Sequence, residues 1–344
     1  MKSFTIPTGY LFKDDYSRGE LETLSIGDYG KKYNVKADFL GYTKEINGVP
    51  NTYCMPLSEK WVITISTQYG CLSRCNFCDV PNVKYNGNAS FEDMYSQLRK
   101  AISLFPTVKY TERLNLHFAR MGEPSFNPDV LRFGEFLLKS KGDFQTETGI
   151  RCEVIHPVLT SMAPKKNKHW QKVIHEWSDI KNKYMGQCGL QMSINSTDDA
   201  QREFMFGGDA HSLEDISAML STLPRPISRK YCLNFAYSTD YVIDAKRVRK
   251  LFDPEKWMCK ITPIHNNTAC STNGIKTIGG YDNFHPYKKP EEDLKNEGFD
   301  VLVFVPSIDE ENGLVTCGNV VLGGSKLKYN SHEIKIEGLP NEDV

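Results

Sequence analysis

The sequence predicts an α/β protein that folds as a partial (β/α)6 barrel preceded by a small β-rich extension. Two observations lead to this fold class. Strand-like and helix-like segments alternate from residue 61 onward, which predicts βαβ units and a parallel sheet. Most of the strand-like segments are continuous apolar runs, which is typical of parallel strands buried on both faces. About six or seven such units fit an incomplete barrel better than an eightfold one.

Residues 1–60 are predicted to form the β-rich extension, because they are rich in Gly, Tyr and Lys and contain the hairpin signal Asn47-Gly48. A second hairpin is expected to join residues 52–55 to the first barrel strand. The predicted strands of the barrel cover residues 61–66, 113–118, 151–156, 189–194, 231–237, 258–264 and 299–306. The predicted domains are the extension at 1–60, a barrel with a C-terminal cysteine loop at 61–325 and a C-terminal tail at 326–344.

Helices are predicted between these strands. The clearest begins after Ser90, a good N-cap, because the apolar residues that follow fall on one helical face. The other predicted helices cover residues 128–139, 166–180, 212–220, 245–251 and 290–296.

The bulk composition is that of a cytoplasmic protein. No apolar run approaches the roughly 20 residues that cross a bilayer, and the N-terminus lacks the features of a signal peptide. The net charge is −1, from 42 basic and 43 acidic residues, which argues against a large nucleic-acid footprint. We therefore expect no membrane partner, and we expect the ten cysteines to be ligands, nucleophiles or core residues rather than disulfides.

Three of the cysteines, Cys71, Cys75 and Cys78, directly follow the first barrel strand. Thiolates at this spacing can cover three irons of a [4Fe–4S] cluster and leave the fourth iron for another ligand. An iron beside bound S-adenosylmethionine can pass an electron to the sulfonium and release a carbon radical. The alternatives are a coincidence of core cysteines or a zinc site. Zinc normally takes four ligands in paired spacings, and the chain has no second C-x-x-C.

Other loops after strands carry polar residues suited to the same cofactor. Gly122 and Glu123 follow the second strand, where glycine permits close approach and a carboxylate could hold the methionyl ammonium. Ser193 and Asn195 end the fourth strand and could hydrogen-bond a ribose or carboxylate, although such residues are also common turn formers. The cofactor-binding candidates are Gly122, Glu123, Thr160, Ser161, Ser193, Ile194, Asn195 and Asn267.

These residues resemble the RlmN/Cfr group of radical S-adenosylmethionine methyltransferases over residues 50–325. The similar segments are residues 66–78 (family SSQxGCxxxCxFC), 85–90 (FNRNLT), 120–124 (GMGEP), 193–195 (Ser-Leu-His), 259–267 (the strand and asparagine leading to Trp-Asn-Pro) and 315–319 (Ala-Ala-Cys-Gly-Gln).

The resemblance implies a radical SAM barrel and a specific role for Cys317. In the family this cysteine receives a methyl group from one S-adenosylmethionine. A 5′-deoxyadenosyl radical from a second molecule then takes a hydrogen from the S-methyl group. The resulting carbon radical adds to an sp² carbon, which in known members is C2 or C8 of an RNA adenine. It also implies an external one-electron reductant such as flavodoxin or ferredoxin. The residues alone allow Cys317 to be a loop nucleophile or an ordinary small hydrophobic residue.

The sequence departs from this family at three points. The resolving cysteine of the family falls at Thr64, which cannot form a disulfide, and Cys54 on the expected neighbouring strand is a possible replacement. A family glutamate thought to assist with the substrate base falls at Asn51, which cannot take a proton. The helical N-terminal domain that helps grip RNA has no counterpart, so the acceptor is either RNA or a smaller molecule.

Three hypotheses follow. The first is a radical SAM methyltransferase that acts on an unactivated sp² carbon through S-methylated Cys317. The second keeps the cluster but drops methyl transfer, so that the enzyme abstracts hydrogen from a small molecule or peptide, with Cys317 as hydrogen donor or lid residue. The third, a non-catalytic iron–sulfur protein, leaves Gly122-Glu123 unexplained.

Overall fold

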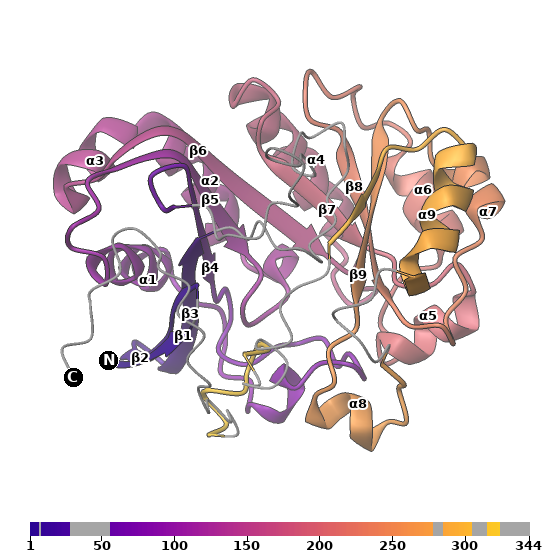
Figure 1. Ribbon diagram of the computed structural model, residues 1–344, viewed down its shortest axis with the longest axis horizontal. Helices are drawn as coiled ribbons and strands as arrows, with labels where there is room; N and C mark the ends of the chain where they lie inside the picture. Colours follow the sequence, from indigo (N-terminus) through magenta and orange to yellow (C-terminus); the bar gives the residue numbers. More distant parts are fainter. Residues whose placement is uncertain (7, 28–55, 278–284, 305–314, 324–344) are drawn as a thin grey trace.

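The computed structural model describes residues 1–6, 8–27, 56–277, 285–304 and 315–323. In this part of the chain, ten strands form one sheet in the order β1 to β10 (Figure 1). The strands are β1 (Lys2–Ile6), β2 (Gly9–Tyr16), β3 (Gly19–Gly27), β4 (Lys60–Ile65), β5 (Tyr110–Phe118), β6 (Arg151–Ser161), β7 (Gly189–Ser193), β8 (Tyr231–Tyr237), β9 (Trp257–Pro263) and β10 (Val301–Val303).

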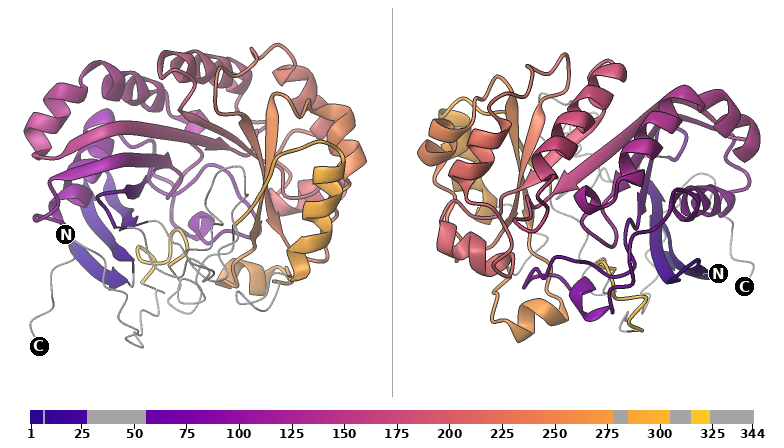
Figure 2. Two further views of the ribbon diagram at one scale, coloured as in Figure 1. Left: turned by 45° about the horizontal axis from the view of Figure 1, so that its top comes forward. Right: turned by 180° about the vertical axis from the view of Figure 1, so that it is seen from behind.

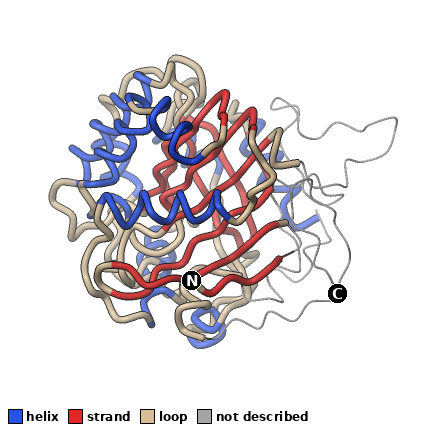
Figure 3. The backbone as a smooth tube through the Cα atoms, turned by 90° about the vertical axis from the view of Figure 1, so that its left-hand side faces the viewer, coloured by secondary structure: helices blue, strands red, loops and turns tan. Residues whose placement is uncertain are grey.

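From β4 to β10, each strand runs parallel to the next one in the sheet. The α-helices between them are α1 (Phe91–Ser103), α2 (Asp129–Lys139), α3 (Lys141–Thr148), α4 (Trp170–Lys183), α5 (Asp199–Met205), α6 (Leu213–Leu220), α7 (Ala245–Leu251), α8 (Thr268–Thr272) and α9 (His285–Asn296). The sheet is curved, with most helices along its outer side (Figure 2), and the strands form one continuous layer beside them (Figure 3). Six strand–helix units followed by a last strand confirm the predicted partial barrel.

The N-terminal strands extend this sheet. β1, β2 and β3 form an antiparallel meander, and β3 pairs antiparallel with β4 so that Leu24 lies opposite Thr64. The other edge of β4 pairs with β5. Because both edges of β4 are occupied, the predicted hairpin between residues 52–55 and this strand is wrong. Residues 52–55 and the predicted Asn47-Gly48 turn lie outside the described residues.

The barrel strands alternate between side chains of the hydrophobic core and inward-facing ones, several of which are polar, and this corrects the expectation of strands buried equally on both faces. In β5, Leu114 and Leu116 belong to the hydrophobic core, whereas Asn115 and His117 line a cavity on the inner side. The core therefore lies between the sheet and its helices, and the inner face is available for polar ligands.

Helix starts agree with the sequence where a strong cap is present. Ser90 caps α1 in a capping box, with its hydroxyl accepting from Asp93 N–H. The predicted helix at 290–296 begins earlier, at His285, and contains Pro290 in its interior. Helices α3, α5 and α8 were not predicted. No helix in the described ranges is long and apolar enough to cross a membrane.

Candidate active site

The three-cysteine loop, defined here as residues 66–82, leaves the C-terminal end of β4. In Figure 1 it meets α8 and the yellow segment 315–323 at the lower edge of the sheet. Asn76 fastens the loop to the end of α5, since its N–H donates to the Met205 carbonyl (2.8 Å) and its side-chain amide to the Phe204 carbonyl (2.7 Å). Asn273 after α8 donates to the Asn76 carbonyl (2.8 Å). The loop is therefore held in place by elements from the far end of the barrel.

The three thiols of this loop are half-buried. Burial raises the pKa of Cys71 to about 12. Burial, followed by the charge of neighbouring thiols, raises the pKa values of Cys75 and Cys78. Such a donor set fits a positively charged iron cluster, which would hold the sulfurs as thiolates. Among the described residues, no group of three or more His, Cys, Asp or Glu side chains is placed so that it could hold a single metal ion.

Gly122 and Glu123 pack directly against the three-cysteine loop. Gly122 has φ +101°, and a Cβ there would lie 2.6 Å from the Gln68 side chain, so glycine is required. Glu123 is 5% exposed, and its carboxylate accepts from the N–H groups of Met162 (3.0 Å) and Ser125 (3.2 Å). Burial raises its pKa. Its charge also acts on Cys71 and Cys75, so the carboxylate lies beside the cysteines.

The candidate residues at the end of β6 are already engaged. The Ser161 hydroxyl accepts from the Trp170 indole N–H (2.8 Å) and from the Ala163 N–H (3.2 Å). The Thr160 hydroxyl donates to the Gln191 side chain at 3.4 Å. Ser161 thus has a clear structural role, and Thr160 faces the inner side of the sheet.

The end of β7 provides a different environment. Ile194 is buried, and Asn195 adopts a left-handed backbone with φ 63°. The Asn195 Oδ1 accepts from the Ala236 N–H (3.0 Å), whereas its buried amide nitrogen has no hydrogen-bond partner in the described part of the chain. A buried donor without a partner suits a ligand acceptor. Ser193 ends the strand and is half-buried.

Asn267 has both side-chain groups occupied. Its Oδ1 caps α8 by accepting from the Cys270 N–H (2.8 Å), and its Nδ2 donates to the Phe77 carbonyl (2.9 Å). Phe77 lies between Cys75 and Cys78 in the sequence. Asn267 therefore supports the three-cysteine loop.

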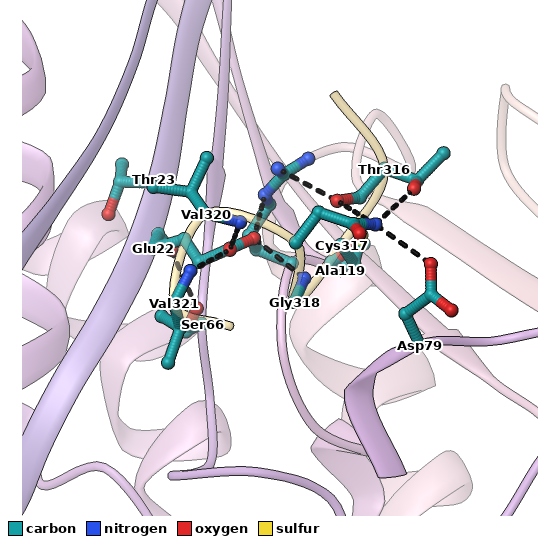
Figure 4. Close-up of polar contacts among 12 residues, drawn as sticks. Glu22, Thr23, Ser66, Asp79, Ala119, Thr316, Cys317, Gly318, Val320 and Val321 are labelled. Atoms are coloured by element: carbon teal, nitrogen blue, oxygen red, sulfur yellow. Dashed lines mark hydrogen bonds and ion pairs between the residues drawn. The ribbon is translucent and has the colours of Figure 1, made fainter. Parts of the chain in front are cut away.

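The Cys317 segment, defined as residues 315–323, is clamped by a buried carboxylate (Figure 4). Glu22 on β3 is fully buried and pairs with the Arg120 guanidinium (2.9 Å). Its oxygens also accept from the N–H groups of Gly318 (2.8 Å), Val320 (2.9 Å) and Val321 (3.1 Å). One carboxylate thus fixes three backbone positions directly after Cys317.

A second contact joins the Cys317 segment to the three-cysteine loop. The Asn319 amide donates to Asp79 (2.8 Å), the residue after Cys78. The Cys317 thiol contacts the Ala119 carbonyl (3.6 Å). Burial raises the pKa of Cys317, against the opposing charge of Arg120. The charge of Cys317 in turn raises the pKa of Cys78, so the two thiols lie near each other.

Two contributors to this site were missed in the sequence. Glu22 stands on β3, the strand beside β4, whereas the acidic position was expected at residue 51; Asn51 and Cys54 lie outside the described residues. Residues 21–26, Leu-Glu-Thr-Leu-Ser-Ile, are half polar, so the sequence carried no clear signal that this acid is buried. The Thr64 hydroxyl is buried and has no partner among the residues described.

The other is Arg202 on α5, whose guanidinium is 1% exposed. It donates to the carbonyls of Ser193 (2.7 Å), Ile194 (2.7 Å), Met162 (2.9 Å) and His211 (2.9 Å). Burial lowers its pKa to about 9. Arg202 ties together the ends of β6 and β7, and its charge acts on the nearby Cys75. No sequence pattern indicated it, because α5 itself was not predicted.

Comparison with known proteins finds likeness at the level of the fold. No family model and no curated protein matches the chain. A radical SAM methyltransferase from Sphaerobacter thermophilus has a TM-score of 0.56 and 14% identity, covering 88% of this chain and 75% of its own. Spore photoproduct lyase complexed with dinucleoside spore photoproduct has a TM-score of 0.38 and 12% identity, over 69% and 74% of the two chains. A mutant of that lyase with bound AdoMet has a TM-score of 0.41 and 12% identity, over 70% and 75%.

Proposed function

We propose that this chain is a radical SAM enzyme that binds a [4Fe–4S] cluster through Cys71, Cys75 and Cys78 and transfers a methyl group through Cys317. The proposal rests on one contact above all, the docking of the Cys317 segment onto the three-cysteine loop through Asp79 and Asn319. The segment that carries the Cys317 thiol is thereby docked on the residue that follows Cys78. The shared fold with a radical SAM methyltransferase is consistent with this chemistry.

The surrounding residues have separate tasks in this proposal. When bound and reduced by one electron from a donor such as flavodoxin or ferredoxin, the cluster and S-adenosylmethionine together supply a 5′-deoxyadenosyl radical. Glu123 would hold the methionyl ammonium with the carboxylate lone pairs that its two backbone donors leave. The unpartnered Asn195 amide would donate to the nucleoside or the carboxylate of the same molecule.

Cys317 would act first as a nucleophile. Its thiol loses a proton, the sulfur forms a bond to the methyl carbon, the methyl–sulfonium bond breaks, and S-adenosylhomocysteine leaves. The charge of Arg120 favours the thiolate, because it opposes the burial that raises the pKa of Cys317. The 5′-deoxyadenosyl radical would then take a hydrogen from the S-methyl group, and the methyl carbon would add to an sp² carbon of an adenine-type base in RNA or in a smaller molecule. The proton on that carbon would leave, the bond between the methylene carbon and the Cys317 sulfur would break, and a second electron from the same donor would return the sulfur to the thiolate. Glu22 keeps Cys317 in place by holding Gly318.

The test uses protein purified with its cluster and incubated with S-adenosylmethionine and a reductant. The peptide that contains Cys317 should gain a methyl mass increment, and Cys317→Ala should lose it while still forming 5′-deoxyadenosine. Cys75→Ala should lose iron and both activities. Cys152→Ala is the matched control, because Cys152 is a buried core thiol at the start of β6. A Cys75→Ala protein that keeps its iron would exclude the cluster assignment.

A second function is favoured by Thr64. Its unpartnered hydroxyl stands where the resolving thiol of the resembled family lies, and a hydroxyl cannot resolve a covalent adduct by disulfide formation. The enzyme would then abstract hydrogen directly from a small molecule or peptide. An unmodified Cys317 peptide, in protein that still forms 5′-deoxyadenosine, would favour this function over methyl transfer.

A further inference from the structure

The inner side of the sheet encloses a cavity that the cofactor candidates do not account for. Its volume is 610 Å3, and side chains of β4 to β10 line it. This size is typical of small-molecule sites, which measure roughly 300 to 1,000 Å3. Gln191 lines the cavity two residues before Ser193 on β7, so the cavity reaches toward the candidate cofactor residues. A ligand in it would lie below the C-terminal edge of the sheet.

Several basic side chains line this cavity. The basic residues that line it are Lys60, Arg113, Arg229, Lys230 and Lys260. Asp300 is the one acidic lining residue in the described ranges, and Lys230 already pairs with it at 2.6 Å. A concave wall of one sign concentrates ions of the other sign. Of these cations, Arg229 acts on His156, so an anion beside that ring would meet a positive charge.

Two buried polar side chains in the cavity wall have unused hydrogen-bonding atoms. His156 is 2% exposed with neither ring nitrogen bonded, and Asn115 is 7% exposed with an unbonded Oδ1. The two residues are opposite each other on β6 and β5. Burial and the charges of Arg113 and Arg229 lower the pKa of His156 to about 3. The ring is neutral at pH 7 and offers one N–H donor and one acceptor.

We propose that this cavity binds the acceptor substrate by an anionic end, a phosphate or carboxylate, so that the substrate is a small molecule of about nucleotide size. Its role as substrate site rests on the proposed function, whereas binding of an anion does not. Along β6, Thr160 is the fourth residue after His156, which is roughly 13 Å of extended chain. An anion held near His156 and Arg229 would leave the remainder of a nucleotide-sized molecule directed toward the Cys317 side.

The first test is calorimetric titration of the full chain at fixed ionic strength with AMP, adenosine, pyrophosphate and citrate. AMP should bind at least about tenfold more tightly than adenosine, because hydrogen bonds to a charged group are strong. Arg229→Gln should weaken AMP binding by about tenfold to a hundredfold. Arg225→Gln is the matched control, since Arg225 lies in the same loop but pairs with Glu255 outside the cavity. If pyrophosphate but not citrate competes with AMP, the anionic end of the substrate is a phosphate. If citrate but not pyrophosphate competes, that end is a carboxylate.

His156→Leu separates a ligand site from a packing defect. Removing two unbonded nitrogens should stabilise the fold, and it should also weaken AMP binding. A stabilised variant that binds AMP as the wild type does would overturn the proposal. Equal affinity for AMP and adenosine would also overturn the proposal. So would RNA binding that Arg225→Gln and Arg229→Gln weaken to the same extent, because that result would place the ligand on the surface.

The two proposals fail separately. AMP binding without any 5′-deoxyadenosine from cluster-loaded enzyme would refute radical chemistry and leave the anion site standing. The reverse result, radical formation without anion binding, would refute the cavity proposal alone.

Discussion

Glu22 shows how one buried charge can organise a site. Its carboxylate is fully removed from solvent, which is costly unless the charge is compensated. Arg120 supplies the opposite charge, and three N–H groups of the Cys317 segment supply hydrogen bonds. Because these donors are backbone groups, the interaction constrains the path of the segment rather than a single side chain. The position of Cys317 therefore depends on a residue in the N-terminal meander.

We expect Glu22→Gln to lower the free energy of unfolding by about 3 kcal/mol, because it removes the negative charge that faces buried Arg120. Urea denaturation would measure this loss. The Cys317 thiol of the same variant should react faster with an alkylating reagent, because the hydrogen bonds from the Val320 and Val321 N–H groups to residue 22 weaken. Glu20→Gln is the control, because Glu20 pairs with Lys13 at a more accessible place on the same strand and should cost less than about 1 kcal/mol. Equal losses in the two variants would contradict the clamp.

His156 predicts a pH dependence. The pKa is near 6.5 in the unfolded chain and about 3 in the folded protein, where burial disfavours the charged ring. The unfolded state binds the proton more readily, so the stability is complete above pH 6.5 and is lost as the pH falls toward 3. At pH 5 this loss should be about 2 kcal/mol relative to pH 7.

Denaturation of the wild type and His156→Leu between pH 4 and 7 would measure the effect. The difference between the two curves should shrink or reverse steadily with rising pH, as the wild type regains the stability that its neutral ring provides. A difference that stays constant with pH would show that His156 is not the group responsible.

At the scale of elements, the C-terminal edge of the sheet is held by short segments that do little alone. Helix α5 has seven residues, yet its Arg202 bonds carbonyls at the ends of β6 and β7. Strand ends expose carbonyls that must find donors when buried. A planar guanidinium can serve several at once. Arg202 binds the carbonyl of Ile194, the residue before Asn195. It also binds the carbonyl of Met162, whose N–H donates to Glu123. Arg202 thus helps to position the loops that carry Glu123 and Asn195.

Arg202→Lys keeps the charge but supplies fewer donors in a different geometry. We expect it to leave carbonyls unbonded and to lower the free energy of unfolding by about 2–3 kcal/mol. Thermal and urea unfolding would measure the change. Arg249→Lys, at an exposed position of α7, should stay within about 0.5 kcal/mol of the wild type. A loss of the same size in both variants would show that Arg202 has no special structural role.

At the scale of the whole molecule, the curved sheet separates two environments. Apolar side chains pack outward against the helices, and polar ones point inward from the same strands. The cysteines, Glu123 and Asn195 lie at the C-terminal edge, where barrel enzymes carry their functional loops. A ligand bound there contacts loops from several strands, so binding should stabilise the whole fold.

We therefore expect S-adenosylmethionine at a hundred times its Kd to raise the free energy of unfolding of the cluster-loaded protein by about 2.7 kcal/mol. Glu123→Gln should weaken this effect, because it removes the charge that would hold the ammonium. Differential scanning calorimetry at several ligand concentrations would test both. If S-adenosylmethionine raised the free energy of unfolding of cluster-free Cys75→Ala protein by the same amount, that result would argue against joint binding of the ligand and the cluster.

Much of the fold was predictable because local patterns determine it. The apolar run at 231–237 and the helical pattern at 245–251, which alternates apolar and basic residues, predicted strand β8 and helix α7 with their bounds unchanged. The three cysteines were recognisable from spacing, and their place after a strand follows from chain order. The alternation of Leu114, Asn115, Leu116 and His117 could also have revealed the polar inner face.

The sequence by itself thus determined the order of strands and helices, the cysteine triplet and the loops that carry Glu123 and Asn195, because each depends on residues close together in the chain. Only the tertiary structure decided that β3 rather than residues 52–55 lies beside β4, that Glu22 holds the segment after Cys317, and that basic side chains from distant strands surround one cavity. These contacts join residues far apart in sequence. Periodicity describes which face of an element is apolar, but it does not specify which distant element will cover that face.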